Sequence, residues 1–81
     1  MSTNDTAVRQ HRIDTIAATA KKAAVALSPY YSVFRVSAKG DYCNLYFGKN
    51  AKLAAEHYLN ECQQPFAVGV EMRVDGVRVE I

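Results

Sequence analysis

The residue types that most often carry out chemistry are few in this chain, and their spacing does not suit it. The two histidines and two cysteines are His11, His57, Cys43 and Cys62. They form neither the C-x-x-C nor the H-x-x-x-H spacing that brings zinc ligands together. His57 and Cys62 belong to a segment that we expect to be helical, and their separation puts them on different faces of it. The sequence therefore predicts no metal site.

Covalent and acid–base catalysis also lack their usual groups. A nucleophilic cysteine needs a neighbouring base, but Cys43 is expected to face the core and His57 the polar side of its helix. The glutamates, which are the candidates for paired catalytic carboxylates, occupy positions that have the pattern of solvated surface. Gly48-Lys49 lacks the second glycine and the Lys-Ser/Thr pair of a phosphate loop. We therefore expect a protein that is not an enzyme and that binds no cofactor.

Tyrosines and cations gather in the middle of the chain. Tyr31, Tyr42 and Tyr46 fall in two segments of alternating pattern, together with Arg35 and Asn44. Tyrosine and arginine are enriched in the hot spots of protein interfaces. Aromatic rings beside cations also stack nucleic-acid bases. The chemistry that the sequence indicates is thus binding, provided that the fold brings these side chains to one surface.

An alanine-rich helix is predicted from Thr6 to Leu27, because apolar residues recur there at three- and four-residue steps. Its apolar stripe consists of Ile13, Ile16, Ala20, Ala23 and Leu27. Residues 1–5 are expected to be a loose tail that supplies the N-cap, and Ser28-Pro29 should end the helix. At ~1.5 Å per residue the helix is about 33 Å long, whereas a chain of this size has a diameter of about 30 Å. Its first turns, with Arg9 and Arg12, should therefore overhang the body.

Two strands are predicted next, from Tyr30 to Ser37 and from Tyr42 to Phe47, joined by a turn-rich loop. If Ser37 lies opposite Tyr42, one side of this hairpin holds the most apolar set and should face the core. That set is Phe34, Val36, Cys43, Leu45 and Phe47. The opposite side then exposes Tyr31, Val33, Arg35, Tyr42, Asn44 and Tyr46.

A second helix and a tight hairpin follow, and these have the clearest signals. Asn50 is a suitable N-cap for a helix whose stripe contains Ala51, Ala54, Ala55, Tyr58, Leu59 and Cys62. Alternation from Phe66 to Val74 predicts a strand, and Asp75-Gly76 predicts a two-residue turn with positive φ at both positions. The expected inward neighbours are Val74–Val77, Met72–Val79 and Val70–Ile81, and the expected outward ones are Arg73–Arg78 and Glu71–Glu80.

The element order is thus α-β-β-α-β-β, which favours a two-layer α+β fold with a four-stranded, mainly antiparallel sheet and two helices. The 81 residues are expected to form a single domain. How the two hairpins join is not visible in the pattern.

Composition limits the setting and the partners. No apolar run is long enough to span a membrane, and the N-terminus lacks the pattern of a signal peptide, so we expect a cytoplasmic protein without a membrane partner. Two cysteines are too few for a secreted disulfide scaffold, and we expect both to be buried thiols. Residues 1–55 carry eight Lys and Arg against three Asp, a net charge of +5, and residues 56–81 carry −3. Such a bipolar chain can steer partners or self-associate.

Two resemblances point in different directions. The strand-strand-helix order of residues 31–62 resembles the arm-binding domains of phage integrases, which read DNA with a sheet. Those domains have three strands before the helix and denser basic residues, where this chain has Ser32, Ser37 and Asn44. In size and element order the whole chain is similar to small inhibitors encoded by bacteriophages, including anti-CRISPR and other anti-defence proteins. That resemblance implies a single domain that blocks a host protein by occupying its surface.

Three hypotheses follow from these observations. The first is a non-enzymatic binding protein, an inhibitor or adaptor of a host protein complex; its predicted partner-binding residues are Tyr31, Arg35, Tyr42, Asn44 and Tyr46, with Arg9, Arg12, Lys21 and Lys22 as a basic margin. The alternative is a small nucleic-acid-binding domain that uses the same aromatic and basic sheet face. The third is a homodimer whose long first helix supplies the interface.

Overall fold

The computed structural model describes residues 3–64 and 69–81 and has the predicted α+β class. The elements are α1 (Thr3–Ala23), β1 (Tyr31–Val36), β2 (Tyr42–Gly48), α2 (Ala51–Cys62), β3 (Gly69–Val74) and β4 (Val77–Val79). The strands form one four-stranded sheet in the order β2-β1-β3-β4, and each neighbouring pair is antiparallel. The predicted element order and sheet type are therefore confirmed. The two hairpins join through β1 and β3.

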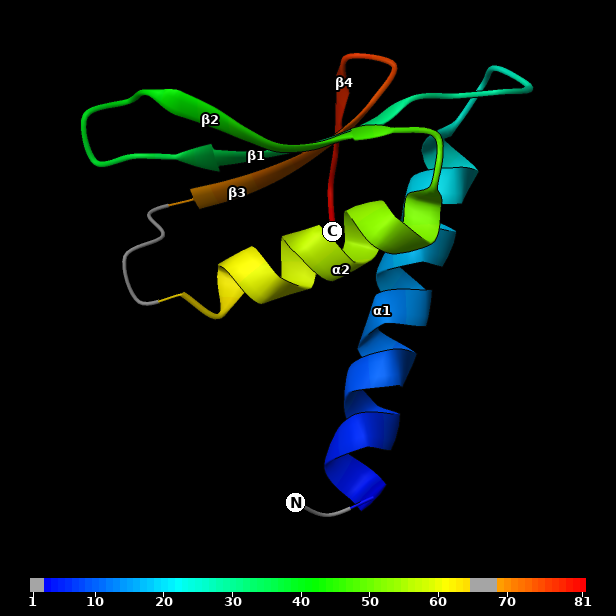
Figure 1. The fold of residues 1–81 in the computed structure, drawn as a ribbon. Coiled ribbons are helices and arrows are strands. Elements are labelled where there is room, and N and C mark those ends of the chain that lie inside the picture. The colour runs from blue at the N-terminus through cyan, green and yellow to red at the C-terminus, as the bar shows by residue number, and fades with distance from the viewer. Residues whose placement is uncertain (1–2, 65–68) are drawn as a thin grey trace.

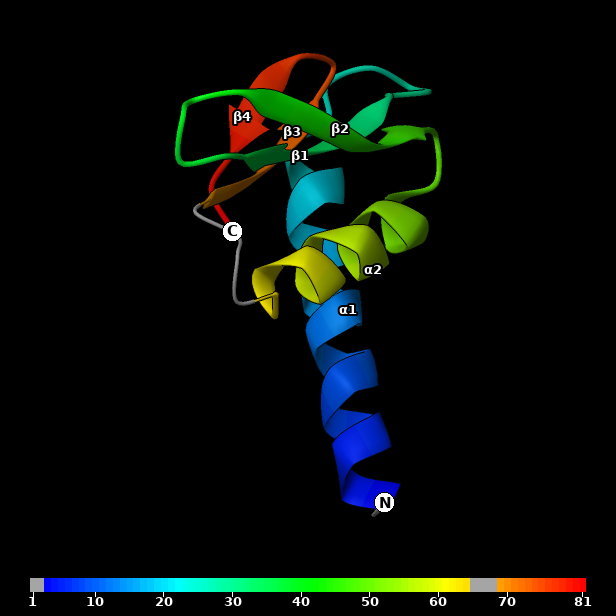
Figure 2. The same ribbon diagram turned by 60° about the vertical axis from the view of Figure 1, so that its left-hand side comes forward.

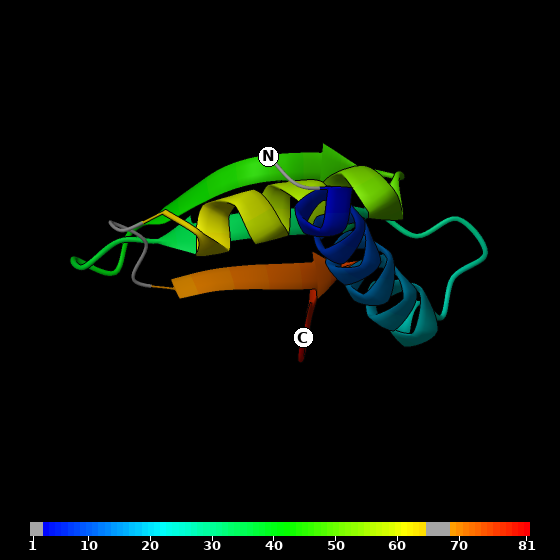
Figure 3. The ribbon, with the colours of Figure 1, turned by 90° about the horizontal axis from the view of Figure 1, so that it is seen from below.

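Both helices lie on one face of the sheet (Figures 1 and 3). Helix α2 packs across β1, β2 and β3, while α1 packs mainly against α2 and also reaches β3 and β4. Three alanines at the centre of this arrangement, Ala20, Ala54 and Ala55, are completely buried. Because an alanine side chain is a single methyl group, α1, α2 and the sheet can approach one another closely. The remaining core is formed by Ile13, Ile16, Ala17, Tyr31, Val33, Ala51, Leu59, Met72 and Val74.

Helix α1 starts earlier and ends earlier than the sequence pattern predicts. It begins at Thr3, within the stretch expected to be a tail, and ends at Ala23 rather than Leu27. The chain has to leave the helix axis there to reach Tyr30, whose backbone N–H donates to Asp75 Oδ1 and whose carbonyl accepts from the Asp75 N–H. Leu27, expected in the apolar stripe, is instead fully exposed.

The predicted overhang of the first helix is confirmed. The N-terminal half of α1 projects well beyond α2 and the sheet (Figures 1 and 2). Side chains from Thr6 to Arg12 are exposed apart from the half-buried Arg9.

The predicted register of the first hairpin is wrong. Val36, not Ser37, lies opposite Tyr42. Ser37 belongs to the loop, because its Oγ accepts hydrogen bonds from the backbone N–H groups of Lys39 and Asp41 at 3.2 and 3.1 Å. Farther along, the register shifts at a β-bulge: Phe34 lies opposite Asn44 and Val33 opposite Tyr46, which leaves Leu45 as the additional residue.

The two sides of β1 and of the end of β2 are exchanged relative to the prediction, whereas Tyr42 and Asn44 at the start of β2 face outward as predicted. Tyr31 and Val33, expected to be outward, are buried under the helices, and Phe47, expected to be inward, is 64% exposed. The bulge also reverses the direction of β2 side chains, so that Tyr46 faces α2 while Tyr42 and Asn44 face away from it. The side of the sheet without helices is called the open face below. Its register positions are Ser32, Phe34, Val36, Tyr42, Asn44, Phe47, Glu71, Arg73 and Arg78.

Helix α2 and the final hairpin agree with the prediction. Asn50 caps α2, and its Oδ1 accepts from the backbone N–H groups of Lys52 and Leu53. Asp75 and Gly76 have φ angles of 52° and 85°, as a two-residue turn requires. The confirmed pairs are Val74–Val77, Met72–Val79 and Arg73–Arg78. Strand β4 ends at Val79, so the Val70–Ile81 and Glu71–Glu80 pairs lie beyond the ladder, and Phe66 and Val68 lie outside the described residues.

Further residues that were expected to be buried are exposed. Val77 lies in β4, which has no further strand beside it within the described part of the chain, and Ile81 lies beyond the end of β4. Cys43 and Cys62 are also exposed, contrary to the expectation of two buried thiols. Cys62 is the last residue of α2, and Cys43 is the second residue of β2, next to the loop that joins β1 to β2. No helix within the described ranges is long and apolar enough to cross a membrane.

Candidate functional site

The structure divides the predicted partner-binding residues among three places. Tyr42 and Asn44 lie on the open face of the sheet, whereas Tyr31, Arg35 and Tyr46 lie on the side of the helices. The four basic residues lie along α1. These are Arg9, Arg12, Lys21 and Lys22.

The three residues on the helix side have structural contacts. Tyr31 is 5% exposed and belongs to the core. Its burial, reinforced by the charge of Asp75, raises the pKa of its hydroxyl above 10.0. The Arg35 guanidinium pairs with the Glu61 carboxylate of α2 at 3.0 Å. The expectation that these residues share an exposed surface with Tyr42 is therefore wrong.

Tyr46 links β2 to the start of α2. Its hydroxyl accepts a hydrogen bond from the Asn50 N–H at 3.1 Å, and its ring stacks on His57 at 5.3 Å between centroids. The ring is thus fixed against α2, and the prediction that it lies on an open sheet surface is corrected.

The open face carries an ordered layer of aromatic rings and cations. Phe34 and Tyr42 meet edge to face, with centroids 6.2 Å apart, and the Arg73 guanidinium lies 5.0 Å from the Phe34 ring and 5.6 Å from the Tyr42 ring. Arg73 is held from its other side by Glu71, because Nε and Nη2 both donate to Glu71 Oε2, at 3.0 and 2.9 Å. Three adjacent strands therefore contribute to one cluster.

A second aromatic pair lies at the other end of β2. Tyr30 and Phe47 stack nearly parallel at 5.1 Å, and Lys49 Nζ lies 5.0 Å from the Tyr30 ring. Tyr42 and Phe47 remain 56% and 64% exposed, so each end of β2 presents an aromatic ring to solvent. The partner-binding residues predicted from the sequence do not include Tyr30, Phe34, Phe47 or Arg73.

The basic residues of α1 have different surroundings. Arg9 donates from Nη2 to Asn60 Oδ1 of α2, which ties the overhanging part of α1 to the body. Arg12 lines a groove between the two helices, whereas Lys21 and Lys22 are exposed in the last turn of α1.

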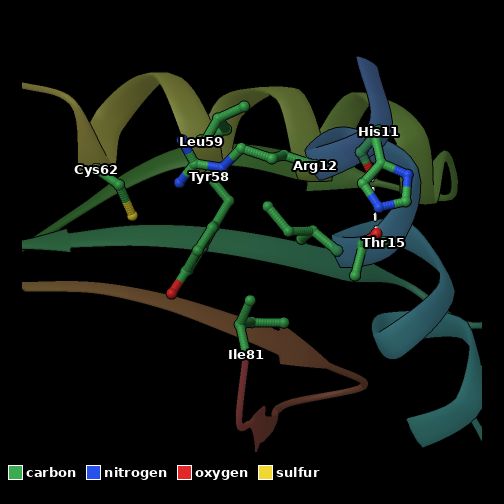
Figure 4. Close-up of a pocket in the computed structure, with 8 residues that line it drawn as sticks. His11, Arg12, Thr15, Tyr58, Leu59, Cys62 and Ile81 are labelled. Atoms are coloured by element: carbon green, nitrogen blue, oxygen red, sulfur yellow. Dashed lines mark hydrogen bonds between the residues drawn. The ribbon is translucent and has the colours of Figure 1, made fainter. Parts of the chain in front are cut away.

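The groove beside Arg12 has a volume of about 460 Å³ and is closed on one side by the C-terminal residue Ile81 (Figure 4). Ile16 and Leu59 form its apolar floor, and Tyr58 and Cys62 form one wall. Although Cys62 as a whole is exposed, partial burial of its thiol in the groove raises the thiol pKa above 9.0, despite the hydrogen bond from Tyr58 and the charge of Arg12. Burial also raises the pKa of Tyr58.

A second hollow, of about 510 Å³, lies where α1 ends and α2 begins. Three lysines line it: Lys21 from α1, Lys49 from the preceding loop and Lys52 from α2. Lys52 Nζ lies 3.5 Å from Asp14 Oδ1, and both side chains are more than half exposed, so this ion pair is weak. The hollow is therefore a concave surface of basic character.

Metal ligands do not converge in the described part of the chain. No group of three His, Cys, Asp or Glu side chains there has the geometry to hold a metal ion. Comparison with known proteins adds no function, since no family model, no curated protein and no solved structure matches this chain.

Proposed function

We propose that this chain is a non-enzymatic binding protein, an inhibitor or adaptor that occupies the surface of a host protein complex through its open sheet face. The observation that supports the proposal is the aromatic and cationic layer on the side of the sheet without helices. Within that layer Tyr42 and Phe47 are more than half exposed. Neither side chain belongs to the core, so packing of the core does not explain why large aromatic residues occupy these positions.

The layer is already ordered before a partner arrives. Arg73 is held by two rings and by Glu71, and Tyr30 holds Phe47. Ordering a flexible side chain on binding costs about 0.5–1.5 kcal/mol, so a surface that is ordered in advance loses less affinity to this term. Aromatic residues and arginine are also the types enriched in interface hot spots.

The chemistry of the partner follows from this surface. Its protein surface should offer apolar groups to Tyr42 and Phe47, and carboxylates to the cations Lys49 and Arg78 at the margins. A positively charged partner surface at these positions would be repelled by Lys49 and Arg78.

Nucleic acid on the same face has less support. Base stacking needs ring faces that are open to solvent, whereas Arg73 lies over Phe34 and Tyr42 and Lys49 lies over Tyr30. The charge of Arg73 is also compensated by Glu71. A phosphate backbone would therefore find few uncompensated cations on this face.

The first experiment is affinity purification from the native host, with and without nuclease. The captured partner is then purified, and its affinity for each variant of this chain is measured. We compare the wild type with the double variant Tyr42→Ala/Phe47→Ala. The matched control is Val8→Ala/Leu53→Ala, which also truncates two exposed apolar side chains but on the helices. Circular dichroism establishes that both variants fold.

We expect the sheet variant to lose at least about tenfold in affinity, because a truncated hot-spot residue costs 2 kcal/mol or more, and the control to bind as the wild type does. Equal binding by both variants would contradict the assignment of the site. Capture that disappears after nuclease treatment would contradict a protein partner and favour nucleic acid.

A further inference from the structure

Two aliphatic side chains in the loop between α1 and β1 point entirely into solvent. Val25 and Leu27 have exposed fractions of 99% and 106%, higher than those of the other exposed large hydrophobic residues in the described part of the chain. The loop itself projects beyond the end of α1 and beyond the sheet (Figures 1 and 3). Single exposed hydrophobic residues are common on soluble proteins. Val25 and Leu27, however, lie together in one projecting loop and make no contribution to the core. Such a pair of exposed aliphatic side chains indicates a surface that contacts an apolar partner.

Lysines lie at both ends of this loop. Lys21 and Lys22 end α1 just before it. Lys49 lies over Tyr30, the residue that ends the loop, and Lys21, Lys49 and Lys52 together line the basic hollow. The exposed aliphatic residues are thus next to a cluster of positive charge, and the partner has to suit both.

The combination distinguishes three kinds of partner. Nucleic acid attracts lysines through its phosphates but gives Val25 and Leu27 no apolar medium to enter. Protein interfaces accept aliphatic side chains, but lysine is depleted in them relative to the rest of the surface. An anionic lipid bilayer accepts both, because lysines bind the charged headgroups while apolar side chains enter the acyl boundary.

We propose that the α1–β1 loop, with the fully exposed Val25 and Leu27 in it and Lys21, Lys22, Lys49 and Lys52 beside it, docks the protein on an anionic lipid bilayer. The sequence-based expectation of no membrane partner depended on the lack of a segment long enough to span one, and docking at the surface needs no such segment. This surface does not include Tyr42 or Arg73, but it shares Lys49 with the margin of the open face, so Val25 and Leu27 are the residues that distinguish bilayer binding from binding of a protein partner.

The test is cosedimentation with unilamellar vesicles of phosphatidylcholine alone and of phosphatidylcholine mixed with phosphatidylserine. We expect binding to the mixed vesicles only, weakened as salt rises. Val25→Ser/Leu27→Ser should lower the partition constant by about a hundredfold, because it removes both apolar side chains from the acyl boundary. Lys22→Gln and Lys49→Gln should each lower it about fivefold. Val8→Ser/Leu53→Ser is the matched control and should bind as the wild type does.

Insertion can be observed directly, because the chain has no tryptophan. We expect the emission of Leu27→Trp to shift to shorter wavelength when mixed vesicles are added, and that of Leu53→Trp to remain unchanged. Since Val25 and Leu27 make no contribution to the core, the loop variants should have the thermal midpoint of the wild type.

Three results would overturn the proposal. The first is the absence of binding to mixed vesicles. The second is binding that depends on the lysines but is unaffected by Val25→Ser/Leu27→Ser, which would indicate general anion binding, including binding of nucleic acid. The third is a Leu27→Trp emission that responds to a captured protein but not to vesicles, which would make the loop part of a protein interface.

Discussion

Replacement of Arg73 by methionine tests whether the open face is held as one ordered cluster. Methionine keeps much of the aliphatic length of arginine but removes the guanidinium. The change therefore deletes the two hydrogen bonds to Glu71 Oε2, at 3.0 and 2.9 Å, and the contacts with the rings of Phe34 and Tyr42. The backbone of β3 and the core beneath it are not altered.

The magnitude follows from these contacts. Hydrogen bonds to charged groups contribute about 1.5–3 kcal/mol when buried, and the lower end applies because the Arg73 side chain is 34% exposed and water screens the pair. Each cation–π contact at such a site contributes about 0.5–1 kcal/mol, and packing of methionine on the two rings offsets part of that. The Glu71 side chain, only 15% exposed, loses its charged partner. We expect a loss of about 2 kcal/mol in the free energy of unfolding, with ~1–3 kcal/mol as the range.

The assay is urea denaturation followed by circular dichroism, supported by thermal melting. For a domain of this size about 2 kcal/mol lowers Tm by roughly 8–16 °C. Arg73→Lys keeps the charge but loses the planar stacking and one of the two donors, so it should lie between Arg73→Met and the wild type. A double-mutant cycle with Glu71→Gln should give a coupling energy of about 1 kcal/mol.

The matched control is Arg78→Met, because Arg78 lies directly opposite Arg73 on β4 but is exposed. We expect this variant to differ from the wild type by less than about 0.5 kcal/mol. If Arg73→Met and Arg78→Met have the same small effect, then Arg73 does not order the rings, and the argument that the open face is preorganised fails.

Three further predictions concern the framework of the site. Asn50→Ala should cost about 1 kcal/mol in urea denaturation, because the N–H groups of Lys52 and Leu53 lose their side-chain acceptor, and Asn50→Asp should retain most of the stability; equal losses in the two variants would contradict the capping role. Gly76→Ala should cost about 1–2 kcal/mol, because its φ of 85° is unfavourable for a side chain although there is room for a methyl group; an unchanged denaturation midpoint would refute this strain argument. Burial, with the charge of Asp75, raises the Tyr31 pKa above 10.0, so the contribution of this group is complete below pH 10.0 and is lost as the pH rises through the folded-state pKa; unfolding followed at several alkaline pH values should show this loss in the wild type and a smaller one in Tyr31→Phe.

Part of the candidate site was predictable from the sequence. Tyr42 and Asn44 were assigned to an exposed sheet surface, and the structure places both on the open face. Arg73 and Arg78 were expected on one side of the final hairpin, which is confirmed, because a two-residue turn fixes the register of its strands. The contact of Arg73 with Phe34 was not predictable, since it depends on the pairing of β1 with β3.

The alternation of residue types could not show which side of the first hairpin faces the core. On β1 the two alternating sets, one with Tyr31 and Val33 and the other with Phe34 and Val36, are both apolar, so the pattern does not identify the core side. On β2 the bulge at Leu45 reverses the alternation in the middle of the strand. The periodicity of a regular strand therefore assigned Tyr46 and Phe47 to the wrong sides.

Features that depend on neighbouring residues were predictable without the structure: the element order, the Asn50 cap and the Asp75-Gly76 turn. Capping and turn geometry involve groups a few positions apart, so local chemistry is sufficient for them. Which side of β1 the helices cover, and which aromatic rings therefore remain exposed, follows from the packing of the whole fold. That choice depends on the pairing of Val33 with Met72 and on their burial in one core with Leu59, and such relations between distant residues leave no periodic signal in the chain.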